Sequence, residues 1–224
     1  MASIIKVDQI QESTTGVGTN FSTTGSATTP TISLGNQTNK GFYDVGTNKI
    51  GVSTGGSKVG EIGVGYGGFT GNIIQVQSTT KTDTSTISTS FGDISGLSIS
   101  ITPRYTTSKI LIIAHISFGK NADIYQFFKL LRDSTDICIG DTAGSRTRTS
   151  VAPMLTASSP SNGLMQNTVP IVFLDSPNTI SAIIYKIQSR VDGGIGYVNR
   201  SGSDSDTANF GRTTSTIMVM EVQQ

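Results

Sequence analysis

The density of apolar residues changes at about Gly71 and divides the chain in two. Before this point, large apolar residues stand isolated among glycine, threonine, serine and asparagine. A single copy of that segment would bury too little area to offset a backbone entropy of about 1–2 kcal/mol per ordered residue. After it, apolar residues come in dense runs separated by turns. We therefore expect an N-terminal region over 1–71 and a C-terminal domain over 72–224.

The runs after Gly71 predict β-strands. Leu97, Ile99 and Ile101 alternate with polar residues, which places three aliphatic side chains on one face of a sheet. The segment 109–118 is almost continuously apolar, as in a central strand covered on both faces. Eight or nine strands at a spacing of roughly 10 residues are typical of a β-sandwich, and of a jelly roll in particular. The other predicted strands are 72–78, 125–132, 137–139, 169–174, 179–189, 197–198 and 215–222.

One of these segments also fits a helix. Ile124, Phe127, Phe128 and Leu131 follow a spacing of three and four, with Asp123 in position to cap the first turn. We favour a strand, because aromatic residues are enriched there and the turn residues 133–136 that follow predict a hairpin.

The closing segment 215–222 is apolar on both faces. Ile217 and Val219 point to one side, and Met218, Met220 and Val222 point to the other. We expect one face to lie on the sandwich core and the other to be covered by a neighbouring subunit.

The N-terminal region predicts a meander of very short strands. Turn signals at 35–36, 47–48 and 55–56 separate short pieces that contain threonine and valine. A disordered linker is more often rich in charge or proline. We expect these strands to be completed between chains. The residues expected to pack this shaft are Ile32, Leu34, Phe42, Tyr43 and Ile50.

Composition supports an all-β chain and excludes several partners. Serine, threonine and glycine supply 87 of the 224 residues, and they favour strands and turns over helices. A net charge of +1 lacks the excess of positive charge that would attract nucleic acid or an anionic membrane. The first residues lack the pattern of a secretory signal, and no apolar run is long enough to span a membrane. We expect no nucleic-acid binding, no membrane insertion and no export by the ordinary route.

Motifs of enzyme chemistry are weak. The G-x-G-x-x-G spelling at 63–68 is not followed by a helical pattern, which phosphate binding requires. His115 is the only histidine and lies in the most apolar strand, so we expect it to be packed or to line a subunit contact. The lone Cys138 is expected to be a small buried hydrophobe. The acids are scattered through turns without a facing pair. We expect no catalytic residue, no metal and no cofactor.

Two polar loops carry the remaining candidate residues. Asp204 and Asp206 form an oxygen-rich turn that lacks the full spacing of a calcium loop, so an ordinary solvated turn is favoured. Arg146 and Arg148 lie in a long polar loop where they would suit an acidic polysaccharide, although two loop arginines are usually just solvated.

The first half carries the most specific motifs. Its opening, MASIIKVDQIQ followed by TTG at 14–16, resembles the start of virion structural proteins of marine bacteriophages, particularly cyanophages. The segments TPTISLG (29–35), NKGFY (39–43) and IGVSTGG (50–56) are similar to a motif of phage tail fibres, with Leu34 in place of the usual aromatic residue. In tail fibres this motif is usually followed by the sequence E-R-L-R-I, which residues 57–62 match only loosely. From QVQ (75–77) to STI (215–217), short matches in order resemble the C-terminal knob of such fibres.

This resemblance implies a homotrimeric tail fibre assembled in the bacterial host cytoplasm and located on the virion. It implies a slim N-terminal shaft or adaptor bound to other virion proteins, and a jelly-roll head of the trimeric tumour-necrosis-factor or C1q kind. We expect the head to bind a host-surface glycan or protein without catalysis, through the loops 141–167 and 192–210. The candidate contact residues are Arg146, Arg148, Asn162, Tyr197, Asp204 and Asp206.

Two other functions are considered. A capsid decoration, head fibre or tail adaptor with a purely structural role is the main alternative, because 224 residues are few for a receptor-binding fibre. A polysaccharide depolymerase is disfavoured, since neither paired carboxylates nor the long repeats of a β-helix are visible.

Overall fold

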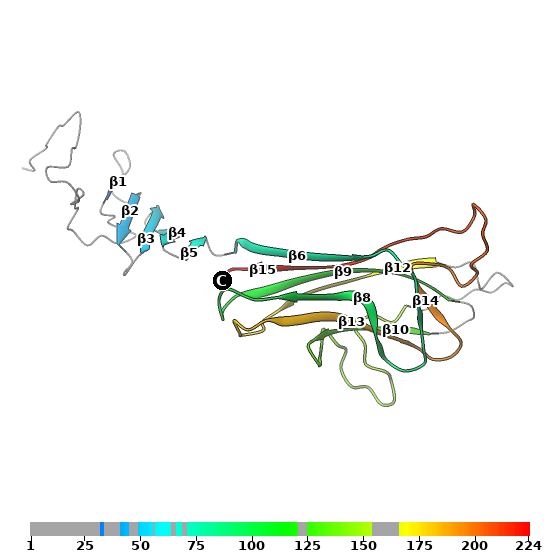
Figure 1. Ribbon diagram of the computed structural model, residues 1–224. Coiled ribbons are helices and arrows are strands. Elements are labelled where there is room, and N and C mark those ends of the chain that lie inside the picture. Colours follow the sequence, from blue (N-terminus) through cyan, green and yellow to red (C-terminus); the bar gives the residue numbers. More distant parts are fainter. Residues whose placement is uncertain are drawn as a thin grey trace, which may run out of the picture. The chain divides into compact units, whose positions relative to one another are not determined.

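The structure is a computed structural model that describes residues 32–33, 41–44, 49–55, 57–63, 66–68, 71–120, 125–153 and 166–224. The chain divides into two compact units, Met1–Thr70 and Gly71–Gln224. Every element in the described ranges is a β-strand, as Figure 1 shows. Within those ranges there is no helix with the length and apolar character needed to cross a membrane. The expected all-β class is confirmed.

The first unit contains a five-stranded antiparallel meander. Its strands are β1 (Ile32–Ser33), β2 (Gly41–Asp44), β3 (Lys49–Thr54), β4 (Ser57–Gly63) and β5 (Tyr66–Gly68). Thr54 pairs with Ser57 across the β3–β4 turn, where Gly55 has a φ of 60°, a left-handed value that suits a two-residue hairpin loop. The glycine-rich segment 63–68 includes the end of β4 and all of β5, which pair antiparallel, so its described residues lie in strands. The expected short strands are confirmed.

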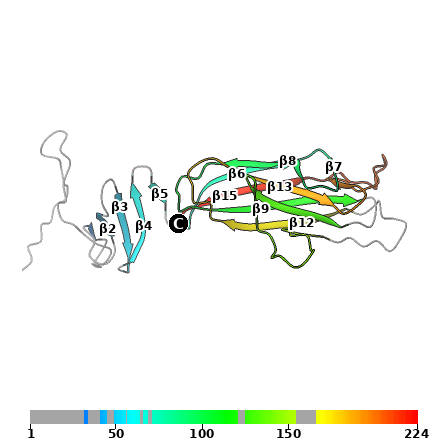
Figure 2. The same ribbon diagram turned by 90° about the horizontal axis from the view of Figure 1, so that it is seen from below.

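The second unit is a sandwich of two antiparallel sheets, drawn as two layers in Figure 1 and from below in Figure 2. One sheet has the order β11-β10-β13-β8, and the other has the order β6-β15-β9-β14-β7, with β12 also paired to β9. The strands are β6 (Ile73–Lys81), β7 (Ser85–Ile87), β8 (Gly92–Ile101), β9 (Lys109–Lys120), β10 (Gln126–Arg132), β11 (Thr135–Ile137), β12 (Gln166–Asp175), β13 (Ile183–Val191), β14 (Gly196–Val198) and β15 (Ser215–Val222).

The strand pairs of the sandwich are nested along the chain. The innermost pair is β10 with β11, and it is enclosed by β9 with β12, then β8 with β13, and finally β6 with β15. Rolling up such a nested antiparallel ribbon so that its strands divide between two sheets gives a jelly roll. The expected jelly roll is therefore confirmed by the connectivity of the described strands.

Several predicted strands differ from the structure at their ends. Segment 126–132 is a strand and not a helix, as we favoured, and 215–222 matches β15. The hairpin after β10 is tighter than predicted: Asp133 has a φ of 53°, so Thr135 already pairs with Arg132, and β11 covers 135–137 instead of 137–139. The prediction of a strand from residue 179 is wrong. β13 begins only at Ile183, because Asn178, with a φ of 52°, belongs to a loop.

The core between the sheets is mainly aliphatic. Ile112, Ile187 and Ile217 are fully buried there. Phe118 of β9 and Phe128 of β10 meet edge to face with ring centroids 5.5 Å apart, which joins the two sheets. Half-buried Cys138 packs against this core, and burial raises the pKa of its thiol.

A polar cluster joins the ends of β10, β12 and β13. Arg132 Nη1 donates to Asp175 Oδ1 and Oδ2 at 3.0 and 2.8 Å, and the Tyr185 hydroxyl donates to Asp175 Oδ2 at 2.7 Å. Tyr185 is fully buried. Burial and the adjacent carboxylate raise the pKa of the Tyr185 hydroxyl, so it remains protonated and serves as a donor.

Replacing the carboxylate at the centre of this cluster will destabilise the sandwich. We expect Asp175→Ala to lower the free energy of unfolding by about 3–5 kcal/mol, because it leaves a buried hydroxyl and a guanidinium without their partner. The measurement is urea unfolding followed by intrinsic fluorescence. Asp136→Ala is the control: it removes a surface partner of Lys129 and should cost about 1 kcal/mol or less. Equal losses in the two variants would contradict the importance of the cluster.

Candidate functional site

The two outer faces of the sandwich differ in chemistry. On the β8-β13-β10 side, Lys186 Nζ and Gln188 Nε2 both donate to Asp93, each at 2.8 Å. These hydrogen bonds lower the pKa of the Asp93 carboxyl. On the same face, Arg190 lies over the rings of Phe91 and Phe127, with distances of 5.5 and 4.6 Å to their centroids. Such a polar, internally paired surface is suited to water.

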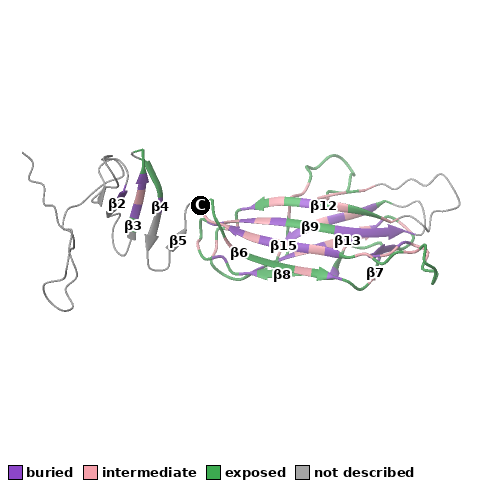
Figure 3. Cartoon of the chain, turned by 90° about the horizontal axis from the view of Figure 1, so that it is seen from above, coloured by how far each residue is buried: buried purple, intermediate pink, exposed green. Residues whose placement is uncertain are grey.

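The outer face of the other sheet is apolar. The register of β15, β9 and β12 places Met218 opposite Ile113 and Ile113 opposite Val172, which makes a row across three strands. A second row contains Met220, Leu111 and Leu174 in the same way. Figure 3 shows the alternation of buried and more exposed positions along β9, β15 and β12. We call this surface the apolar face; it consists of Val76, Leu111, Ile113, Val172, Leu174, Met218, Met220 and Val222.

A single copy leaves much of the apolar face in contact with solvent. Val172 is 62% exposed, Val76 52% and Leu174 47%. Directly opposite pairs on a sheet lie side by side, so these residues form one continuous patch instead of scattered apolar positions. Continuous apolar patches of this kind mark interaction surfaces.

The closing strand confirms one half of its prediction. Ile217 and Val219 are fully buried on the core side. Met218, Met220 and Val222 face outward and are only half-buried. Exposed His115 stands next to them, opposite Thr216 on β15 and Pro170 on β12. Cover by a neighbouring subunit stays a prediction for these residues.

The first candidate loop, 141–167, is described only at 141–153 and 166–167, and its first part is closed at the base by hydrogen bonds. Gly140 N donates to Thr149 O at 3.2 Å, and Val151 bridges to Phe128, which holds the loop beside the edge of β10. Figure 1 shows it projecting from the layer that contains β10 and β13. Arg148 Nε donates to Gly140 O at 2.6 Å, and Arg146 Nη1 donates to Ala143 O at 3.3 Å. Both side chains are exposed, but each is bonded to the backbone of its own loop.

The second candidate loop is held by ion pairs. Asp204 pairs with Arg212 and, at 3.5 Å, with Arg200. Its hydrogen bond to Arg212 is the main reason that the pKa of the Asp204 carboxyl is lowered. Two arginines thus occupy this carboxylate, which is unfavourable for calcium, and Asp206 is exposed. Within the described ranges, no group of three or more acidic, histidine or cysteine side chains is placed to hold a metal ion.

The structure does not gather the predicted contact residues into one site. Tyr197 is only 8% exposed, and the Arg200 guanidinium lies 3.7 Å from the centroid of its ring, so little of Tyr197 is open to a ligand. Asn162 lies outside the described residues. Among those described, no hydrogen bond or ion pair joins the loop of Arg146 and Arg148 to that of Asp204.

Four of the five predicted shaft residues lie in strands of the N-terminal sheet. Ile32 is paired with Phe42, and Tyr43 is paired with Gly51. Phe42 is half-buried, whereas Ile50 is 51% exposed. Leu34 falls outside the described residues. Packing between copies stays a prediction for this set.

A polar cavity near the start of β8 was not predicted. It has a volume of about 570 Å³ and is lined by residues 84–88, 92–95, Ser189 and Arg200. The sequence signal is the group of hydroxylated residues at 84–86 and 88, which does not differ from the other serine- and threonine-rich segments of the chain.

Comparisons with known proteins identify no family. No family model matches the sequence, and no curated protein is significantly similar to it. Among solved structures, Eiger TNF from S. frugiperda matches with 9% identity and a TM-score of 0.31, over 66% of this chain and 94% of that one. The infectious bursal disease virus VP2 subviral particle matches with 12% identity and a TM-score of 0.36, over 78% of this chain and 42% of that one. The Gt strain of the same virus gives 13% and 0.36, over 79% and 48%. The chain thus spans less than half the length of the viral structures it matches, and these low scores assign no function.

Proposed function

We propose that the chain is a structural component of a phage virion, a homotrimeric tail fibre that attaches to the host surface without catalysis. The observation that carries the proposal is the apolar face, which a single copy leaves uncovered. The location on the virion, the trimer and the tail fibre are inferred from the resemblance of the N-terminal sequence motifs to those of phage tail fibres.

The character of the apolar face supports the proposed self-assembly. Its eight members are all uncharged, so an apolar partner surface is required. Burying a large aliphatic side chain contributes about 1.5–3 kcal/mol, so even partial cover of this patch favours association. A further copy of the chain supplies such a surface, so no other protein is needed to cover the face. The N-terminal sheet has the same need, since Ile50 and Val59 are 51% and 41% exposed.

The ends of the sandwich support the proposed attachment. The Gly71 amide donates to Gln223 O at 2.6 Å, so the second unit begins and ends at the same end. β6 runs away from this end for nine residues, about 30 Å, and the segments 82–91 and 192–214 lie at the far end. A trimer presents three copies of each far-end segment, and their weak contacts combine through a high effective concentration.

A charge on the apolar face will separate the copies. We expect Ile113→Glu to convert a particle of about three times the 23.5 kDa chain mass into single chains, because a carboxylate in an apolar interface is strongly unfavourable. Sedimentation velocity measures the mass. Ser100→Glu places the same charge on an exposed position of the other sheet and should leave the trimer intact. A trimer in both variants would exclude the apolar face as the interface.

Removing the loop beside β10 will reduce attachment. The Gly140–Thr149 hydrogen bond closes its base, so residues 141–148 can be replaced by Asn-Gly without opening the sheet. We expect at least tenfold less binding of the fluorescent full chain to marine cyanobacterial cells, with an unchanged particle mass. The double variant Arg146→Ala, Arg148→Ala keeps the loop and shows whether its charges are the contacts. Unchanged cell binding after excision would remove this loop from the attachment surface.

A purely structural virion protein is the second candidate. It is favoured by the internal pairing of the loops, since Arg148 and Asp204 are already bonded within the chain. Antibody labelling of virions distinguishes the two: a label at the tail tip supports the fibre, and a label on the capsid or collar supports the structural role.

A further inference from the structure

The polar cavity lies beside an irregularity in β8. Lys186 of β13 pairs with Ser98, but Gln188 pairs with Asp93, so four residues of β8 stand against the single residue Ile187. Within this bulge Gly96 has a φ of 85°, which side chains other than glycine rarely allow. Ile94 and Ser95 of the same bulge line the cavity. Bulges are common where a strand re-aims its side chains beside a site.

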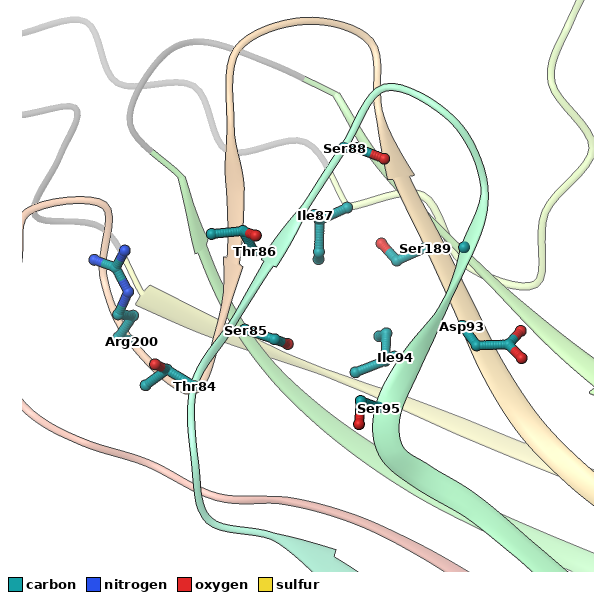
Figure 4. Close-up of a pocket in the computed structure, with 11 residues that line it drawn as sticks. Thr84, Ser85, Thr86, Ile87, Ser88, Asp93, Ile94, Ser95, Ser189 and Arg200 are labelled. Atoms are coloured by element: carbon teal, nitrogen blue, oxygen red, sulfur yellow. The ribbon is translucent and has the colours of Figure 1, made fainter.

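Hydroxyl groups dominate the walls of this cavity. Figure 4 shows Ser85 on β7 and Ser189 on β13 directed into the space between β7 and the start of β8. Within the described ranges, no side-chain hydrogen bond occupies the hydroxyls of Ser85, Thr86, Ser95 and Ser189. These groups remain free to donate to a ligand and to accept from it.

Ser189 is the most informative of these groups. The residue is 2% exposed, and its Oγ has no hydrogen-bond partner. Buried polar groups without partners are rare, because leaving them unpaired costs stability, and each one calls for an explanation. A ligand hydroxyl in the cavity would satisfy Ser189.

The charged residues at the margin are already occupied. The carboxylate of Asp93 points away from the cavity in Figure 4 and is bonded to Lys186 and Gln188. Arg200 stacks on Tyr197 and lies 3.5 Å from Asp204. Since neither charge is free to pair with a ligand, the cavity is suited to an uncharged molecule.

The floor of the cavity is apolar. Ile87 and Ile94, each 5% exposed, point into it from β7 and β8. A sugar ring combines an apolar C–H face with hydroxyls around its edge, which matches an isoleucine floor with serine and threonine walls. The volume of about 570 Å³ is within the range of small-molecule sites, about 300–1,000 Å³.

We propose that this cavity binds a neutral sugar residue, and that it is one of the points at which the trimer engages host-surface polysaccharide. The second clause rests on the proposed function, whereas the first stands on the geometry of the cavity alone. Serine and threonine hydroxyls orient the sugar, and Ile87 and Ile94 contact its C–H face.

Isoleucine methyl NMR of the full chain tests the site directly. The probes are the methyl glycosides of glucose, galactose, mannose and N-acetylglucosamine at millimolar concentration, with N-acetylneuraminic acid as the charged comparison. We expect at least one neutral glycoside to shift the methyl signals of Ile87 and Ile94 in a saturable way. Ser85→Ala with Ser189→Ala should weaken that binding about tenfold. Ser98→Ala, an exposed serine of β8 outside the cavity, should leave it unchanged.

The stability of the Ser189→Ala variant separates a ligand group from a structural one. Since Ser189 Oγ has no partner, its removal should keep or raise the melting temperature while weakening sugar binding. The proposal is overturned if no neutral glycoside moves the two methyl signals, if only the charged sugar does, or if the double variant binds as the wild type does. Cell binding at the wild-type level in the double variant refutes the cavity as an attachment point, but it does not contradict the proposed tail fibre. Saturable methyl shifts without any cell binding would contradict the proposed tail-fibre function but would support the sugar site.

Discussion

The pairing of β9 with β15 on one side and β12 on the other determines which side chains this protein presents on its outer surface. Side chains alternate across a strand, so this register sends Ile112 into the core and Ile113 to the outside. A slip of one residue would exchange the two sets. Since β9 carries aliphatic residues on both faces, the core can satisfy only one of them. The other face needs a second apolar surface, and the proposed assembly of the molecule follows from that requirement.

The sequence predicted this requirement better than it predicted its geometry. Period-two alternation identified the all-β class, and Met218 and Met220 in β15 already indicated a second covered face. The rows that join them to Ile113 and Val172 depend on pairing between segments about 50–100 residues apart, which one sequence does not specify. Strand ends were missed for a local reason: Asp133 and Asn178 adopt left-handed conformations that shorten or delay the strands beside them.

The candidate sites were predicted less well than the strands, because they depend on contacts that one sequence does not specify. Arg146, Arg148 and Asp204 stood out as charged residues in polar loops, but the structure bonds each of them within the chain. The cavity was not predicted because its lining comes from separate segments of the chain: β7, a bulge in β8 and one serine of β13. Serines and threonines are so common in this chain that those lining a cavity look like all the others. What distinguishes Ser189 is burial without a partner, a property of the folded state alone.

In the proposed assembly, association and recognition use different surfaces of one sandwich. This assembly requires that the apolar face is covered in the native protein, which the oxidation rate of Met218 and Met220 in dilute hydrogen peroxide measures. If copies of the chain cover the face, both thioether sulfurs should oxidise at least tenfold more slowly in the native full chain than in the unfolded chain. Oxidation of both at the unfolded rate, with the fold intact by circular dichroism, would show that the face is open to solvent and would contradict the proposed assembly.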